Sequence, residues 1–395
     1  MINYKNFFSV ILIVALIFQI SKFYTFYLEY SDWQYADWLI NYQGGFIRRG
    51  LIGEILFKTQ NFLPLDLDIL VLYFVIFLYL VLTIVLIKSV GYLENSKIDI
   101  LIFLSPGFFL YPIMNSEIIG RKEIFLFALL GLFVFFEKYV KDRYLLGITL
   151  FIILVLSLTH TGLLFYSPYL LFLFFIIKVY RNKKLSFLEI FIIATFLLVI
   201  FLLIYFNTGS KAQVIEICNS IKNFVKNDCI NRGQFLWLYS PVIEYVDVKS
   251  RLNLSTNFVI YLTSLFFVFI FFSVKLYFAK FKSNNNLIDS INPFMIFFLL
   301  FLCTIPIYIV GIDWGRYISM SYFSTYFIYI YLIKQKIIIF NSKNFFFKKL
   351  VSRNIFFIFV FVYAFTWTFP FYGANNFKFT LKKPLTSVLK KIDNY

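Results

Sequence analysis

Eleven apolar runs, most of them long enough to cross a lipid bilayer, take up most of this chain. They lie at 7–27, 68–88, 98–113, 123–138, 144–159, 162–179, 186–206, 257–278, 289–311, 317–334 and 354–372. Hydrophobic residues make up 61% of the 395 positions and charged residues only 14%, against roughly 45–50% and about 25% in a soluble domain. A membrane-spanning helix needs about 20 apolar residues. The sequence therefore predicts an all-α, polytopic integral membrane helix bundle of about 11 spans.

Lysine and arginine residues are distributed unevenly between the loops on the two sides of this predicted bundle. With the N-terminus inside, 19 of the 37 cations fall in inner loops and 7 in the short outer loops. Short cytoplasmic loops carry the excess of Lys and Arg in membrane proteins, so we expect a cytoplasmic N-terminus. The Lys and Arg residues behind the net charge of +17 are then explained by their distribution over the loops, and no nucleic-acid partner is expected.

This topology divides the one membrane domain, 1–395, into spans and two longer outer segments. Residues 28–67 form an outer loop with an interfacial helix, and 207–256 form a periplasmic loop. Cys218 and Cys229 both fall in the second segment; a disulfide in an oxidising compartment and two free thiols are both open. The basic tail after residue 373 favours an inside C-terminus, so ten or twelve spans are alternatives.

The first outer loop combines acids, arginines and glycines in a way that suggests a phosphate site. It carries two aspartates and then the string GGFIRRGLIGEI. Glycine lets the backbone approach a ligand closely, and paired arginines bind phosphate oxygens through two parallel hydrogen bonds. An interfacial helix over 46–57, anchored at lipid head groups, is the alternative. The candidate residues here are Asp32, Asp37, Gly44, Gly45, Arg48 and Arg49.

Three shorter outer segments add further ionisable groups. Glu117 and Arg121 are four residues apart, the spacing of a helical ion pair, yet several charged groups at the mouth of a bundle are costly unless they are partnered or used. The string DWGR could pin a turn or complete an anion site. The single histidine excludes a multi-histidine metal site, and hydrogen bonding within the fold is its alternative role. The candidates are Glu117, Arg121, Lys122, His160, Asp313 and Arg316.

The chain carries none of the short motifs of soluble nucleotide-binding or hydrolase domains. The strings GxxxxGK[ST], GxGxxG, HExxH and GxSxG do not occur. The predicted inner loops are too short to hold a nucleotide-binding domain. Any energised substrate is therefore expected to arrive already activated and attached to lipid.

The string GGFIRRGLIGEI, followed by GRKE, a His-x-Gly apex and DWGR, resembles multispanning proteins of bacterial surface-polysaccharide gene clusters, including O-antigen and capsule repeat-unit polymerases. The layout, with an inner N-terminus and an acidic first outer loop, is similar to that of C-type glycosyltransferases. The resemblance implies transfer of an oligosaccharide from undecaprenyl diphosphate at the periplasmic face of the inner membrane. Membrane lipid, the lipid-linked glycan and polysaccharide-assembly proteins are the expected partners.

The resemblance also implies roles for the candidate residues. Transfer requires stabilisation of a departing lipid diphosphate, for which the arginines are candidates, and a base for the acceptor hydroxyl. Asp37 is the expected base, with Asp32, Glu117 and His160 as alternatives, and no metal or cofactor is expected. A flippase or exporter of lipid-linked sugars, a transferase that adds a single sugar and a structural membrane protein are the competing hypotheses.

Overall fold

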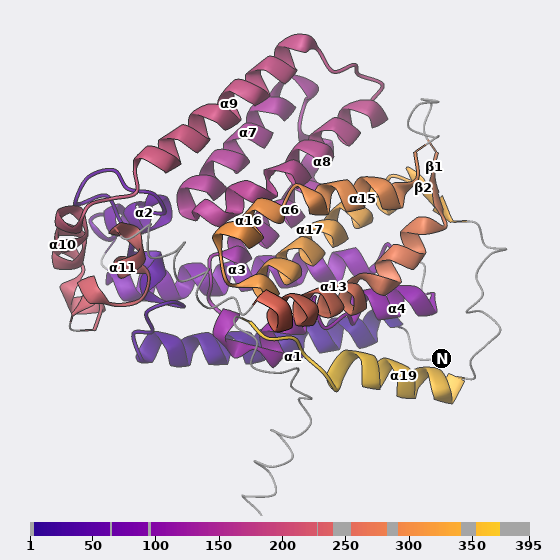
Figure 1. The fold of residues 1–395 in the computed structure, drawn as a ribbon, viewed down its shortest axis with the longest axis horizontal. Helices are drawn as coiled ribbons and strands as arrows, with labels where there is room; N and C mark the ends of the chain where they lie inside the picture. The colour runs from indigo at the N-terminus through magenta and orange to yellow at the C-terminus, as the bar shows by residue number, and fades with distance from the viewer. Residues whose placement is uncertain are drawn as a thin grey trace, which may run out of the picture.

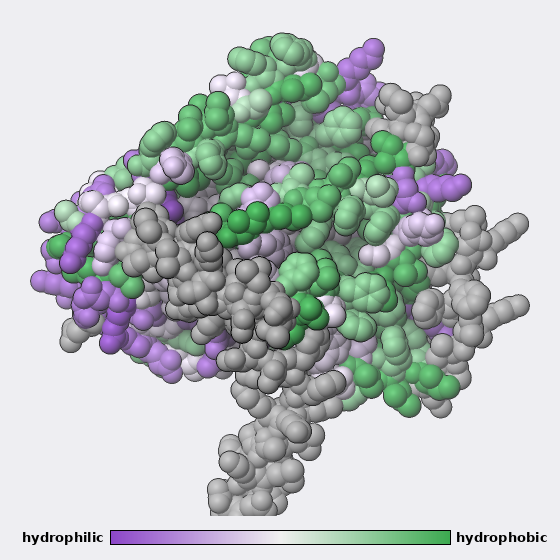
Figure 2. All heavy atoms as spheres, viewed as in Figure 1, coloured by the Kyte–Doolittle hydropathy of each residue, from purple (hydrophilic) through white to green (hydrophobic). Residues whose placement is uncertain are grey.

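A computed structural model describes residues 4–63, 65–93, 96–226, 228–239, 254–282, 291–340 and 353–371. This part of the chain is mostly helical, and its only sheet has two short antiparallel strands (Figure 1). Apolar side chains cover the middle of the molecule, while polar ones gather mainly at the end with α10 and α11 and in smaller groups at the opposite end (Figure 2). The arrangement is that of an all-α membrane bundle. The remaining part of the predicted periplasmic loop and the basic tail lie outside the described residues.

Seven helical segments among the described residues are long and apolar enough to span a membrane. They are α1 (Tyr4–Leu28), α3 (Leu67–Val90), α7 (Asp142–Thr159), η4 (Thr161–Tyr166) with α8 (Ser167–Tyr180), α9 (Phe187–Phe206), α13 (Leu254–Tyr277), and α15 (Pro293–Leu302) with α16 (Ile305–Val310). The other helices are α2 (Leu51–Gln60), α4 (Lys97–Phe103), α5 (Tyr111–Met114), α6 (Glu123–Phe136), α10 (Lys211–Ser220), α11 (Gly233–Tyr239), α17 (Trp314–Lys334) and α19 (Arg353–Phe365), with short 3-10 turns η1 (Ala36–Leu39), η2 (Ser116–Ile118), η3 (Glu137–Tyr139), η5 (Lys222–Phe224) and η6 (Cys229–Asn231).

Two of the predicted spans are not continuous helices. The run 98–113 consists of α4 and the single turn α5, because a residue before proline avoids the helical conformation and Pro106 ends the helix here. The run 289–311 breaks between Leu302 and Ile305. Pro306 has no N–H to donate, and its ring would clash with the carbonyl four residues earlier if the helix continued. The count of eleven spans therefore stays a prediction.

Helix α17 is the central element of the bundle. Every residue from Gly315 to Leu332 is buried, although the helix carries many tyrosines and serines. It packs against α6, α13 and α8, and α6 in turn packs against α3. Its first residues lie at one end of the bundle and its last residues at the other, so groups on α17 connect the two ends.

The end of the bundle that holds the start of α1 also holds the two-stranded sheet (Figure 1). Strand β1 (Ala279–Phe281) pairs antiparallel with β2 (Ile338–Phe340). Close to it, the Nζ atom of Lys275 lies 3.1 Å from Oδ1 of Asp99, and both side chains are almost completely buried. The Tyr329 hydroxyl donates to the same Asp99 oxygen at 3.0 Å. This ion pair joins α13, α4 and α17.

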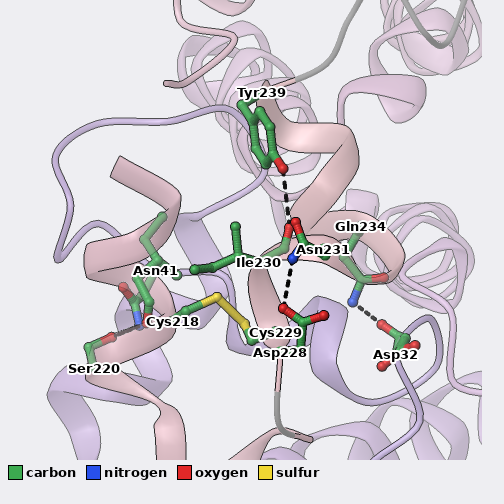
Figure 3. Close-up of a disulfide and its surroundings, with 11 residues drawn as sticks. Asp32, Asn41, Cys218, Ser220, Asp228, Cys229, Ile230, Asn231, Gln234 and Tyr239 are labelled. Atoms are coloured by element: carbon green, nitrogen blue, oxygen red, sulfur yellow. Dashed lines mark hydrogen bonds between the residues drawn. A yellow bond between two sulfur atoms is a disulfide. The ribbon is translucent and has the colours of Figure 1, made fainter. Parts of the chain in front are cut away.

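The opposite end carries a small helical cap, residues 207–226 and 228–239, which includes α10 and α11. Cys218 of α10 and Cys229 of η6 form a disulfide, so the pairing that the sequence left open is present (Figure 3). The cap lies on the first outer loop: Asn41 Nδ2 donates to Ser220 Oγ at 3.0 Å, and Gln234 donates to the carbonyl of Asp32 (Figure 3). The disulfide and these contacts tie the loop to the cap.

Candidate functional site

Four cations from three segments meet at the capped end of the bundle. We call Arg49, Arg121, Lys122 and Arg316 the cation cluster. The Nζ atom of Lys122 donates to the carbonyl of Arg49 at 3.0 Å, and the charges of all four cations act on His160. The first outer loop, the GRKE string, the histidine apex and the DWGR string are thus brought together.

Asp37 belongs to this cluster through a buried ion pair. Its Oδ1 atom lies 3.4 Å from Nζ of Lys122, and both side chains are buried. Burial lowers the pKa of Lys122, and the Asp37 carboxylate opposes this effect. Asp37 sits in η1, directly beside the buried Trp38, whose indole N–H donates to the carbonyl of Gly120 at 2.6 Å. The carboxylate that the sequence favours as a base is therefore the counter-ion of a lysine.

Arg316 is held by two carboxylates. Its Nη2 atom lies 2.8 Å from Oδ2 of Asp313, and its Nη1 atom lies 3.1 Å from Oε1 of Glu123. The Asp313 contact is the turn-pinning ion pair that the sequence left as one alternative. Because two acids face this guanidinium, its charge is already balanced within the protein.

Arg49 and Arg121 have no carboxylate in ion-pair contact among the described residues. Arg49 donates from Nε to Oγ1 of Thr161 at 3.3 Å. Arg121 donates from Nε to the carbonyl of Glu117 at 3.4 Å, and its guanidinium lies 5.0 Å from the ring centre of Trp33. Burial and the neighbouring Arg316 lower the pKa of Arg121. Two guanidinium groups at this end are thus without a counter-charge of their own.

His160 lies between α7 and η4, where Nδ1 of its ring accepts a hydrogen bond from the backbone N–H of Gly162 at 3.1 Å. Since Nδ1 is the acceptor, the proton of the neutral ring lies on Nε2. Burial and then the positive charge of the cation cluster hold the pKa of His160 well below its ordinary value. The ring is therefore a neutral hydrogen-bond donor at pH 7, whereas the sequence proposed it as an alternative base.

Arg48 and the glycines beside it contact the cap. Arg48 donates from Nη2 to the carbonyl of Trp237 at 3.1 Å. A Cβ atom on Gly44 would clash with the backbone of Gln213, and Gly45 adopts a φ of 102° that favours glycine. The close backbone approach that the sequence assigned to a ligand is made here by the chain itself. The phosphate-binding role of these residues stays a prediction.

The helical ion pair that the spacing of Glu117 and Arg121 offered as an alternative to a functional role is not found. Residues 116–118 form a 3-10 turn, and Gly120 has a φ of 82°, so no helix runs from one side chain to the other. Glu117 is exposed. A helix of the first outer loop is present as α2, but it begins at residue 51 rather than 46, because Arg49 has a φ of 73°. Its interfacial position stays a prediction.

Asp32 lies at the edge of the cap rather than in the cation cluster. Its backbone carbonyl accepts from Gln234, and its side chain packs where Gly233 has no Cβ atom (Figure 3). The partners that the structure gives Asp32 are therefore cap residues. Its role as an alternative base stays a prediction.

A cavity of about 50 Å³ opens beside the cation cluster and extends between α1, α3, α6 and α17. Arg121, Glu123 and Arg316 line its polar end, and apolar residues such as Leu82 and Phe323 line the rest. Glu123 is the residue that the sequence reasoning missed. It stands in the GRKE string, but neither its burial nor its contact with Arg316 follows from that string alone.

In comparisons with known proteins, no protein-family model, no curated protein and no solved structure matches the chain. Among the described residues, no group of three or more His, Cys, Asp or Glu side chains is placed to hold a metal ion. The ionisable groups that meet at the capped end are the cation cluster, His160 and Glu123.

Proposed function

We propose that the protein is a membrane glycosyltransferase that acts on saccharides linked to undecaprenyl diphosphate during assembly of a bacterial surface polysaccharide. The reaction transfers the saccharide to a hydroxyl acceptor and releases the lipid diphosphate. A polymerase of O-antigen or capsule repeat units is the specific form we favour.

The observation that carries the proposal is the pair of guanidinium groups, Arg49 and Arg121, that have no carboxylate in ion-pair contact among the described residues. A buried cation without a counter-ion is costly, and guanidinium groups bind phosphate oxygens bidentately while keeping their charge. A departing diphosphate supplies the missing negative charge, and preorganised donors stabilise it most as that charge develops. Neutral His160 adds a hydrogen-bond donor. Its ring carries no extra proton that the reaction would have to remove.

The position of the cluster supports a reaction at the membrane surface. It lies at the capped end of an apolar bundle, where a lipid-anchored substrate can present its diphosphate while its chain stays in the bilayer (Figure 2). The disulfide of the cap favours an oxidising compartment, and the loop cations favour a cytoplasmic N-terminus at the other end. Both lines of reasoning favour an active site that faces the periplasm.

The first test is deletion of the gene, followed by analysis of surface glycan and lipid-linked intermediates. Accumulation of single repeat units on lipid supports polymerisation, and loss of one sugar from the unit supports single-sugar addition. Accumulation of units on the cytoplasmic leaflet would instead show a flippase. Unchanged glycan and unchanged intermediates would refute a role in this pathway.

Complementation of the deletion strain tests the site itself. Arg121→Gln removes an unbalanced guanidinium and should leave the defect uncorrected at normal protein level. Arg143→Gln is the matched control, because Arg143 is an exposed arginine in the first turn of α7, with its guanidinium over the ring of Tyr144. Restoration of glycan by both variants would contradict the role of Arg121.

A further inference from the structure

Two buried polar atoms without a hydrogen-bond partner lie at the cavity beside the cation cluster. Oε2 of Glu123 and Nε of Arg316 are buried and have no hydrogen-bond partner. Gln19, Thr83 and Ser319 also line the cavity, and each is more than nine-tenths buried. None of these three side chains hydrogen-bonds another described residue. Buried polar groups are nearly always satisfied, so two unsatisfied atoms at one cavity, with three polar side chains lining it beside them, indicate a polar ligand.

The size and shape of the cavity limit that ligand. A volume of about 50 Å³ holds roughly three to five water-sized groups, at about 10–15 Å³ each. The lining on α17 runs from Arg316 to Phe323, which corresponds to a depth of about 10 Å at 1.5 Å per residue. A hydroxyl or hydroxymethyl group fits this space, whereas a whole sugar ring does not.

We propose that this cavity binds the hydroxyl-bearing end of the acceptor and that Glu123 is the general base that removes its proton. The inference rests on the proposed transferase function and deepens it. Arg316 holds Oε1 of Glu123 at 3.1 Å, which orients the carboxylate and leaves Oε2 as the proton acceptor. Gln19, Thr83 and Ser319 supply hydrogen-bond partners for the acceptor.

The chemical step balances with the groups at hand. The acceptor oxygen forms a bond to the anomeric carbon of the donor sugar, and its proton passes to Oε2 of Glu123. The bond between the anomeric carbon and the diphosphate oxygen breaks, and its electron pair leaves with the lipid diphosphate. Arg121 and Arg49 stabilise the charge that develops there. Asp37, already paired with Lys122, orients the lysine in this scheme.

Glu123→Gln tests the proposal in full-length protein reconstituted into lipid nanodiscs. The lipid-linked saccharides extracted from the deletion strain serve as donor and acceptor. The amide oxygen of Gln can still accept from Arg316, so a purely structural role predicts near-normal activity. A general base contributes about 10²–10⁴-fold, so we expect kcat to fall at least 100-fold with KM changed less than threefold.

The pH profile separates a base from a residue that only positions Arg316. Activity of the wild type should fall on the acidic side as Glu123 is protonated, and the residual activity of Glu123→Gln should lack this limb. Glu123→Asp, which keeps a carboxylate, should retain the limb and exceed the activity of the Gln variant. Equal loss of kcat in both variants, or an acidic limb that persists in Glu123→Gln, would overturn the assignment.

Thr83→Val tests the acceptor side of the cavity, because it removes a hydroxyl without changing the shape. One lost hydrogen bond predicts a KM for the acceptor raised about three- to tenfold. Thr149→Val is the matched control on α7, where Thr149 is buried and donates to the carbonyl of Leu145. Equal KM values for the two variants would contradict the cavity as the acceptor site. An inactive wild type would refute the transferase itself, whereas an active Glu123→Gln variant refutes only the base.

Discussion

The cap should loosen when its disulfide is removed, while the membrane bundle stays folded. The disulfide joins Cys218 and Cys229 across a separation of 11 residues. Replacement of both cysteines by serine restores the conformational freedom that the cross-link takes from the unfolded cap. For a loop of this length the chain-entropy relation gives about 9 cal/mol/K, or about 3 kcal/mol at 25 °C.

This free energy translates into a measurable change in cap opening. About 3 kcal/mol corresponds to an opened population raised on the order of 100-fold, since each 1.4 kcal/mol is a factor of ten. Residues 211–220 and 233–239 should therefore exchange their amide protons faster by about that factor. The first outer loop should follow, because Arg48 and Asn41 hydrogen-bond the cap.

Hydrogen exchange followed by mass spectrometry in detergent measures this opening, with peptides of α3 as the internal reference. Cys303→Ser is the matched control, because Cys303 is a free, exposed cysteine. Faster exchange confined to the cap and the first outer loop agrees with the reasoning. Unchanged exchange in the double variant would show that packing alone holds the cap, and faster exchange in α3 would show that the cap stabilises the whole bundle.

Two further predictions concern the buried charges. Asp99→Asn removes the carboxylate that pairs with the buried Lys275 and should cost about 3–5 kcal/mol of unfolding free energy in detergent, whereas Asp99→Leu with Lys275→Met should cost far less. Equal losses of unfolding free energy in the two variants would contradict this prediction. Because the pKa of His160 is lowered on folding, its contribution to stability is complete above about pH 6.5 and is lost as the pH falls below that value. His160→Gln should therefore make Tm less dependent on pH between 7 and 5. An unchanged pH dependence of Tm would refute the lowered pKa of His160.

The membrane bundle could be predicted from the sequence because apolar runs report burial in lipid directly. The runs that became α1, α3, α7 and α9 begin and end within three residues of the helices found. The predicted span 98–113 failed because apolar composition does not register Pro106 as a helix end. Composition therefore predicted the class of fold better than the number of complete spans.

The residues of the candidate site could be picked out from the sequence, but not their partners. Arg121 and Arg316 stood out because charges are costly at the mouth of an apolar bundle. Their environments differ, however, because Arg316 meets Glu123 across 193 positions of sequence, while Arg121 stacks on aromatic rings. Arg48 contacts the cap, and only the packing of the cap on the first outer loop reveals this. Local motifs do not carry such long-range pairings.

Transfer kinetics of Arg121→Gln test the central claim most directly, namely that unbalanced guanidinium groups stabilise a departing lipid diphosphate. The assay follows release of undecaprenyl diphosphate from extracted lipid-linked saccharide by nanodisc-reconstituted protein, with Arg143→Gln as the control. Removal of one preorganised donor to a developing anion costs about 10²–10³ in kcat, so we expect that loss for Arg121→Gln and no loss for Arg143→Gln. A kcat for Arg121→Gln within threefold of the wild type would contradict the account.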